Sequence, residues 1–458
     1  MMIRIRRILA GAVAVCMLGT VTACSGGSGD GYERQNGFVF RKNTYYSIYT
    51  DDSGETMGVY LNEKPIFNFR NDDETVDRYQ FGIRMYFTYD NDLYCVKDGK
   101  PAIAATDVQK IITAGNGAVY QLDDSIYMVD ANGRHTELDD ADADSTFAIS
   151  PDGMQVAFTE DGIVELNGKE IGDGTVLSLA DDGTMFIDYN GKLLVSKKGE
   201  KIDSDELSDE APDISDHLCV FTFDKKSILF YTGSKMMVMD ANGNCTKLSS
   251  NRVLPKSSVG GGYSADFRNF VGVEFSGSDL SNTYRRYILK GDEYENFKIA
   301  KSEDGRLSMD ARTLMYSTDK GVYVVSTEKE DADSQRIARA DVDFDSIYYN
   351  ENMTKFAYKT DDGIKVAYRN SDTDEECDED VYIECILGNA VIAYSHDDGC
   401  LGVIEKGEFV SKLDIDLIAS GKCGTGEMYY VSSGDEVYMT TDGSNYTRLS
   451  TDFEIDAT

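Results

Sequence analysis

A repeat of short apolar segments joined by turns is the feature that most restricts the fold of this chain. Each copy has an apolar strand, a turn rich in Asp, Asn and Gly, and a second strand; the sharpest copy is "FAISPDGMQVAFTEDGIVELNGKEI" at residues 147–171. Alternating apolar and polar residues predict strands, and the Asp-Gly pairs predict hairpins, so the chain is predicted to be all-β. Eleven copies align, about 38 residues apart on average, on the strand positions Tyr49, Phe87, Tyr120, Phe158, Ile187, Phe230, Phe275, Tyr316, Tyr358, Tyr394 and Tyr430.

The length of the repeat favours a β-propeller built from about eleven short β-meander units, because blades of several strands recur at about 40–45 residues. An array of β-sandwiches would repeat at about 100 residues, and the coils of a β-solenoid are shorter and more regular. One small sheet cannot bury both of its faces, whereas sheets arranged in a ring bury face against face. We therefore expect the recurring Phe or Tyr to lie between blades, where each buried side chain contributes roughly 1.5–3 kcal/mol.

The number of units bears on the domain organisation, because a single ring usually holds four to eight blades. The stretch "DSDELSDEAPDISD" at residues 203–216 is acidic, poor in apolar residues and interrupted by Pro, which is typical of a linker. We predict two propellers divided there, with about five units in residues 37–206 and about six in residues 207–458. The alternative is one large ring.

The N-terminal residues have the layout of an export signal. Several arginines precede an apolar run at residues 8–18, which is too short to require a membrane-spanning helix. The "VTAC" that ends at Cys24 resembles a bacterial lipoprotein box. The resemblance implies a signal peptide at residues 1–23, and a lipidated Cys24 with a flexible tether at residues 24–36. Acyl chains such as palmitate on this cysteine would hold the protein on a cell membrane, facing outside the cytoplasm.

A second resemblance concerns the repeat itself. The stretch "SPDGMQVAF" at residues 150–158 resembles the TolB-type propeller repeat of bacterial envelope proteins, in which Ser-Pro-Asp-Gly precedes an apolar strand that ends on an aromatic residue. "LADDGTMFID", which starts at Leu179, keeps Asp-Asp-Gly and the apolar run but lacks Pro. Most other copies keep only the general pattern. The resemblance implies a propeller in the cell envelope and does not indicate a particular partner.

The charge of the chain excludes one class of partner. There are 82 acidic and 45 basic residues, for a formal net charge of −37. Binding to nucleic acid requires clustered Lys and Arg, so nucleic acid is not expected as a partner. Electrostatic attachment to anionic lipid is equally disfavoured, so contact with the membrane must come from the lipid anchor.

Known catalytic and metal motifs are absent from the sequence, which has no G-x-S-x-G, no phosphate-binding or dinucleotide glycine motif and no H-E-x-x-H. Each of the three histidines, His135, His217 and His396, stands near turn residues and is expected to be solvated. The acidic runs that start at Asp139 and Asp341 lack the Gly and Glu that a calcium-binding EF-hand loop requires. No catalytic residue, metal site or cofactor is therefore predicted.

Cysteines offer candidate disulfides, because an exported protein can form them. Seven cysteines remain after Cys24 and the one in the signal peptide, so at least one would stay unpaired within the chain. The two pairs that we consider are Cys377 with Cys385 and Cys400 with Cys423.

Together these features predict a lipid-anchored, extracytoplasmic β-propeller that acts as a binding or scaffold module. Its partner would be an envelope protein, a peptide or a glycan, bound through loops on one face of a rigid ring. The alternative, which we favour less, is an enzyme: a hydrolase or lyase that acts on surface polymers with carboxylates in the propeller channel. A tight cluster of carboxylates would favour the enzyme, and a broad apolar patch would favour a protein partner. The absence of Trp weakens a glycan role, although Tyr can also stack on sugars.

Overall fold

The structure is a computed structural model. It describes residues 33–35, 38–41, 44–50, 56–61, 64–68, 78–81, 84–97, 100–139, 141–214, 219–222, 224–255, 267–275, 282–308, 310–371, 373–417, 419–423, 428–433, 436–450 and 454–455. Strands dominate these residues, and their helical elements are the short α2 (Ser204–Ser208) and the 3₁₀ turn η1 (Phe344–Ser346). The predicted all-β class is confirmed.

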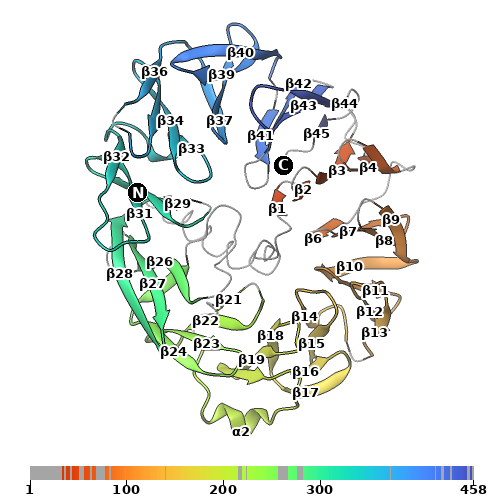
Figure 1. Cartoon of the computed structure of the whole chain (residues 1–458). Coiled ribbons are helices and arrows are strands. Elements are labelled where there is room, and N and C mark those ends of the chain that lie inside the picture. The colour runs from red at the N-terminus through yellow and green to blue at the C-terminus, as the bar shows by residue number, and fades with distance from the viewer. Residues whose placement is uncertain are drawn as a thin grey trace, which may run out of the picture.

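Eleven antiparallel sheets form from the described residues, and most are meanders of four strands in chain order (Figure 1). The first five sheets contain β1 (Glu33–Gln35), β2 (Phe38–Arg41), β3 (Thr44–Thr50), β4 (Thr56–Leu61) and β5 (Lys64–Asn68); β6 (Arg78–Phe81), β7 (Arg84–Tyr89), β8 (Asp92–Lys97) and β9 (Lys100–Ala105); β10 (Val108–Ala114), β11 (Ala118–Leu122), β12 (Ser125–Val129) and β13 (His135–Glu137); β14 (Thr146–Ile149), β15 (Val156–Glu160), β16 (Ile163–Leu166) and β17 (Lys169–Asp173); and β18 (Thr175–Leu179), β19 (Met185–Tyr189) and β20 (Lys192–Ser196).

The other six sheets contain β21 (Cys219–Phe221), β22 (Ser227–Tyr231), β23 (Met236–Asp240) and β24 (Cys245–Ser249); β25 (Arg252–Pro255), β26 (Asn269–Phe275), β27 (Asn282–Lys290) and β28 (Glu293–Ser302); β29 (Gly305–Leu307), β30 (Thr313–Thr318), β31 (Gly321–Ser326) and β32 (Gln335–Ala338); β33 (Tyr348–Tyr349), β34 (Lys355–Thr360), β35 (Gly363–Tyr368) and β36 (Glu375–Cys377); β37 (Tyr382–Leu387), β38 (Ala390–Ser395), β39 (Cys400–Glu405) and β40 (Glu408–Asp414); and β41 (Ala419–Cys423), β42 (Met428–Ser433), β43 (Glu436–Thr440) and β44 (Thr447–Ser450).

The repeat found in the sequence corresponds to these sheets one for one. Ten of the eleven recurring positions lie in the second strand of a sheet, from Phe87 in β7 to Tyr430 in β42. The eleventh, Tyr49, lies in β3, which pairs with β2 and β4. The predicted hairpins are also present: Asp161 and Gly162, which join β15 to β16, have φ values of 47° and 80°. Positive φ at both residues is the geometry that a two-residue hairpin turn requires.

The sheets follow one another in chain order around an oval, each with its first strand toward the middle and its last strand outward (Figure 1). A further strand, β45 (Glu454–Ile455), pairs with β3, and its Ile455 lies opposite Tyr49. It uses the end of β3 that β2 leaves unpaired, since β2 pairs only with residues 44–46 of that strand. One sheet therefore contains strands from both ends of the described chain, as propellers commonly do.

Side chains of the second strand pack alternately toward the two neighbouring sheets. Phe158 and Val156 join a core cluster with Val119 and Met128 of the preceding sheet, whereas Ala157 faces Met185 of the following sheet. Phe158 is fully buried, as are Phe87 and Phe230 at the equivalent position. The expected burial of the recurring residue is thus confirmed for these three positions.

The sheet β25–β28 departs from that expectation, because Phe275 is 39% exposed. Phe275 is the last residue of a long strand, and the buried part of β26 lies closer to its start. There Gly272 has no side chain, and a Cβ built on it would lie 2.9 Å from the Tyr287 ring. Tyr287 is fully buried, so a tyrosine from the adjacent strand fills the space beside the glycine. The prediction for Phe275 was wrong because this residue is the seventh of its strand, whereas Phe158 is the third residue of β15.

One turn recurs between the first and second strands of three sheets. In each copy a hydroxyl donates to the Asp two residues on: Ser150 to Asp152 at 2.6 Å, Thr222 to Asp224 at 2.8 Å and Ser308 to Asp310 at 2.6 Å. The same hydroxyl oxygen accepts the N–H of the residue five positions on, at 2.9–3.0 Å. These Asp side chains are therefore structural, which confirms that Asp152 forms a turn.

Residues 203–214 of the acidic segment pack against two sheets. Ser204 in α2 donates its hydroxyl to the Asp173 carbonyl at 2.7 Å. The N–H of Leu193 donates to the Pro212 carbonyl at 3.0 Å, beside the outer strand of the three-stranded sheet β18–β20. Two propellers remain a prediction, and their proposed limit after residue 206 falls within α2. Likewise, β1 lies inside the segment that was predicted as a tether.

Candidate functional site

An irregularity in an innermost strand sets the position of one carboxylate. In the pairing of β37 with β38, Ile383 lies opposite Ala393 and Cys385 lies opposite Ile392, which leaves Glu384 as the extra residue of a β-bulge. Bulges re-aim side chains and are common beside functional sites. Glu384 Oε2 accepts a hydrogen bond from the Ser420 hydroxyl at 2.7 Å and another from the Tyr429 hydroxyl at 3.0 Å. The carboxylate is thus held by two hydroxyls of the next sheet.

Burial sets the protonation state of the tyrosine that holds this carboxylate. Tyr429 is only 1% exposed, and its pKa is raised, first by burial and then by the negative charge of Glu384. The phenol therefore stays protonated and remains a hydrogen-bond donor at every physiological pH. This arrangement fixes one oxygen of Glu384 and leaves the other without a partner among the residues that the structure describes.

Exposed aromatic rings lie close to Glu384 in the chain and at the same end of the sheet. Tyr382, at the start of β37, is 47% exposed and lies opposite Tyr394 in β38. The ring of His396 meets both tyrosines edge to face, with centroids 4.9 Å from Tyr382 and 4.8 Å from Tyr394. Lys359 places its Nζ 4.7 Å from the centroid of the Tyr382 ring. These contacts hold the exposed tyrosine in one orientation.

A second exposed tyrosine comes from the neighbouring sheet. Tyr348 in β33 is 38% exposed, and its pKa is raised by burial of its hydroxyl and then by the nearby charge of Glu384. We call Tyr348, Tyr382, Glu384 and His396 the inner-strand site. It combines two tyrosine faces, a carboxylate acceptor and an imidazole, on or directly after strands near the middle of the oval in Figure 1.

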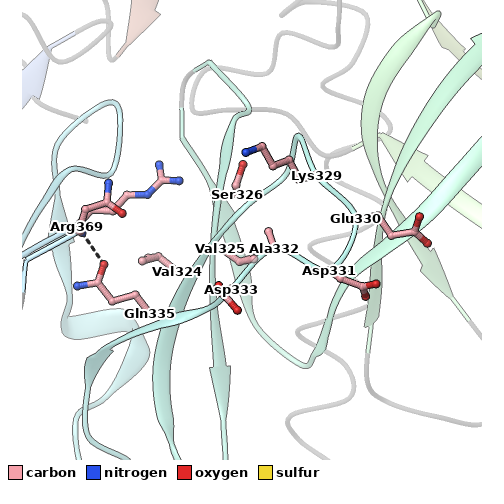
Figure 2. Close-up of a pocket in the computed structure, with 11 residues that line it drawn as sticks. Val324, Val325, Ser326, Lys329, Glu330, Asp331, Ala332, Asp333, Gln335 and Arg369 are labelled. Carbon is pink, nitrogen blue, oxygen red and sulfur yellow. Dashed lines mark hydrogen bonds between the residues drawn. The ribbon is translucent and has the colours of Figure 1, made fainter.

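A pocket lies at the opposite end of the sheets, between the loops that precede two outer strands (Figure 2). The loop between β31 and β32 and the loop between β35 and β36 enclose a volume of about 340 Å³. Gln335 joins the two loops: its side-chain oxygen accepts the Asn370 N–H at 2.6 Å, and its amide donates to the Tyr368 and Ser371 carbonyls, each at 3.0 Å. Arg369 lines the pocket and donates to the hydroxyl of Thr313.

The cysteines considered for disulfides carry free thiols where the structure describes them. Cys377 lies in a core cluster between the sheets β33–β36 and β37–β40, and Cys385 lies in the next cluster, between β37–β40 and β41–β44. Cys400 is buried in β39, and Cys423 is in β41, where its side chain is outside the described residues. Both pairings remain predictions. Cys24 lies outside the described residues as well.

The other residues singled out in the sequence are dispersed. His135 is exposed and bonds through Nδ1 to the Tyr120 hydroxyl at 2.8 Å, and His217 is outside the described residues. Asp142 and Asp343 bind backbone N–H groups of their own turns. In the part of the chain that the structure describes, no three His, Cys, Asp or Glu residues gather closely enough to hold a metal ion. No described helix has the length and apolar character needed to cross a membrane.

Sequence reasoning missed the inner-strand site. It treated His396 as a solvated turn residue and Tyr394 only as a packing residue, and it gave no role to Tyr382 or Glu384. Tyr394 is buried as expected, but its cross-strand neighbour is exposed. The available signal was the pair of aromatic strand residues, twelve positions apart, with a histidine directly after the second strand.

No family model matches this chain, and no curated protein sequence matches it. Among solved structures it is similar to an oligogalacturonate lyase in complex with manganese, at 11% identity over 71% of this chain and 96% of the other, with a TM-score of 0.28. It is similar to a eukaryotic initiation factor at 9% identity, over 74% and 96% of the two chains, with a TM-score of 0.32. It is also similar to the tricorn protease at 10% identity, over 92% and 49%, with a TM-score of 0.24. At these scores the likenesses carry no argument about function.

Proposed function

We propose that this protein is a lipid-anchored, extracytoplasmic binding module, and that its inner-strand site binds a glycan. The observation that supports this most directly is the position of Glu384, whose carboxylate is turned by a bulge and held by two hydroxyls beside exposed tyrosines. Sugars present hydroxyl donors, which a carboxylate accepts, and apolar ring faces, which tyrosine rings cover.

The distribution of exposed apolar residues supports a glycan over a protein partner. Large hydrophobic side chains that are exposed among the described residues come from seven different elements or turns, and only Tyr348 and Tyr382 share neighbouring innermost strands. Protein interfaces of ordinary size need a contiguous apolar centre with a polar rim. Two exposed tyrosines and one carboxylate on neighbouring innermost strands could contact one or two sugar rings, and they are too few to form the apolar centre of a protein interface.

Replacing Tyr382 with Ala is expected to weaken glycan binding about tenfold, because the variant removes a rigid stacking face. Bacterial surface polysaccharides on a glycan array would first identify a ligand, and calorimetry would then compare dissociation constants. Glu384→Gln should weaken the binding of the same ligand by a similar factor, since a charged hydrogen-bond acceptor becomes neutral. Ile163→Ala is the matched control, because Ile163 is 41% exposed on another sheet. Equal affinities in all four proteins would contradict the proposed site.

Cleavage of the same glycan is the second candidate function, and it is favoured by the fixed orientation of the Glu384 carboxylate. Glycoside hydrolysis generally uses two carboxyl groups, so an enzyme would need a second acid beside Glu384. Incubating the bound polysaccharide with the protein and measuring new reducing ends or unsaturated products separates the two functions. Products that the wild type forms and Glu384→Gln does not form would identify an enzyme. An unchanged polymer would support binding without cleavage.

Membrane attachment is proposed from the sequence around Cys24 and has its own test. Cys24→Ala is expected to move the protein from the membrane fraction to the soluble fraction, because loss of the acyl chains removes about 0.8 kcal/mol for each buried CH₂. Fractionation of cells that express the wild type and the variant, followed by immunoblotting, measures this directly. Cys95→Ala serves as a control cysteine within the sheets, and unchanged membrane association of Cys24→Ala would refute the anchor.

A further inference from the structure

We propose that the pocket between the β31–β32 and β35–β36 loops binds an anionic group, either a carboxylate or a phosphate. The pocket has a volume of about 340 Å³, which is at the lower end of the range of small-molecule sites. Two cationic side chains from two different sheets line it, Lys329 and Arg369. The inference does not rest on the proposed glycan function, because the inner-strand site lies at the other end of the sheets.

The directions of the side chains divide the pocket into a cationic and an acidic side. Lys329 and Arg369 point toward one another, and Ser326 lies beside Lys329 (Figure 2). Glu330 and Asp331, which follow Lys329 in the same loop, point away from Arg369 in this view, and Asp333, the third acid that lines the pocket, lies below the two cations. The space between the two cations is therefore lined by donors: an ammonium, a guanidinium and the hydroxyl of Ser326.

Within the described part of the chain, the cations of this pocket lack the ion pairs that neighbouring cations have. Arg306 is 2.6 Å from the carboxylate of Asp345, and Lys365 is 2.8 Å from that of Asp374. Among the described residues, no carboxylate lies within ion-pair distance of Lys329 or Arg369, although the chain has 82 acidic and 45 basic residues. Two like charges that face one another repel, and an anion between them would remove that repulsion.

The guanidinium is held in place before a ligand arrives. One Nη of Arg369 donates to the Thr313 hydroxyl of the adjacent sheet, and the loop that carries Arg369 is joined to the other loop by Gln335. Arg369 is itself only partly exposed. A fixed guanidinium loses little conformational entropy on binding, and its planar fork matches the paired oxygens of a carboxylate or a phosphate.

Calorimetry of the whole chain at low ionic strength tests this site, with inorganic phosphate and glucuronate as the two probes. At least one probe is expected to bind, and raising the salt concentration should weaken the binding because partly exposed charges are screened. Lys329→Gln should weaken binding about threefold or more, and Arg369→Gln about tenfold or more, whereas Arg369→Lys should fall between Arg369→Gln and the wild type. The stronger of the two probes identifies the class of anionic group.

Two controls keep the result interpretable. Lys320→Gln changes an exposed lysine of the same sheet, in the β30–β31 turn at its other end, and should leave binding unchanged. Lys329 is exposed in a loop, so Lys329→Gln should melt at the wild-type temperature and report on binding alone even if Arg369→Gln unfolds. The proposal is overturned if neither probe binds the wild type, or if Lys329→Gln and Lys320→Gln bind the probes as the wild type does.

Discussion

Phe158→Ala is expected to lower the free energy of unfolding by about 3–5 kcal/mol, because it removes a large, fully buried ring from a closely packed interior. Phe158 packs with Val119 and Met128 of the preceding sheet, so the variant leaves a cavity between two sheets instead of one within a sheet. Urea denaturation followed by far-ultraviolet circular dichroism would measure the change. A shift of the midpoint without a change of slope would show that stability alone has changed.

Phe275→Ala is the matched control for this prediction, since it makes the same substitution at the equivalent position found in the sequence repeat. Phe275 is 39% exposed, so its loss should cost less than about 1 kcal/mol. Equal losses in the two variants would contradict the assignment of Gly272 and Tyr287 to the buried place in the sheet β25–β28.

The fold could be predicted because its signal is local and repeated. Each copy contains two strands and their connecting hairpin. The segment from Tyr49 to Tyr430 holds eleven copies, so the mean repeat length is clear even though some copies are irregular. Phe275 could not be placed in the same way, because an aromatic residue at the end of a seven-residue strand looks like the recurring residue, although it lies three positions from Gly272 and therefore on the opposite face of the strand. Gly272 has no side chain to give a signal, and only the buried Tyr287 ring beside it shows which part of β26 is covered.

The recurring turn between the first and second strands depends on a side-chain contact and not on Pro or Gly. The Pro and Gly of "SPDG" drew attention to residues 150–153, yet the conformation depends on a hydroxyl and on an Asp two residues later. Thr222 and Ser308 start the same turn, which contains neither Pro nor Gly in these two copies. Lys225 and Ala311 there adopt positive φ values of 59° and 55°, where Gly153 has 71°. The side-chain contact is the stronger signal for this turn.

The candidate sites depend on contacts between sheets, which explains why sequence patterns did not reveal them. Glu384 is placed by a bulge, as are the extra residues of β10 and β18, and a bulge is a property of strand pairing that leaves no mark on the pattern of one strand. Lys329 and Arg369 are 40 positions apart, about one repeat, and line the same pocket because consecutive sheets place equivalent loops side by side. In a repeat protein of this kind, candidate pocket residues can therefore be sought by comparing the loops before the outer strands of consecutive sheets.

Gly363→Ala is expected to lower the free energy of unfolding by about 3 kcal/mol, for a reason that differs from cavity formation. Gly363 has φ of 133°, a conformation that L side chains rarely adopt, and a Cβ there would collide with the backbone carbonyl of Cys377 on the outer strand β36. A carbonyl that belongs to a strand ladder cannot move without breaking its own hydrogen bonds. Gly321 has the same φ and would collide with the carbonyl of Ala338, so Gly321→Ala should behave alike.

Gly162→Ala separates the two components of this cost. Gly162 also has positive φ, at 80°, but no atom lies within 4 Å of a Cβ built on it. Its substitution by Ala should therefore lower the free energy of unfolding by about 1 kcal/mol, the cost of placing an L residue in the left-handed region. Urea midpoints of Gly363→Ala, Gly321→Ala and Gly162→Ala, measured together, would show whether the third and fourth strands of successive sheets approach equally closely. A cost at Gly363 no larger than that at Gly162 would mean that β36 can move away from β35, and the close pairing of these outer strands would then be wrong.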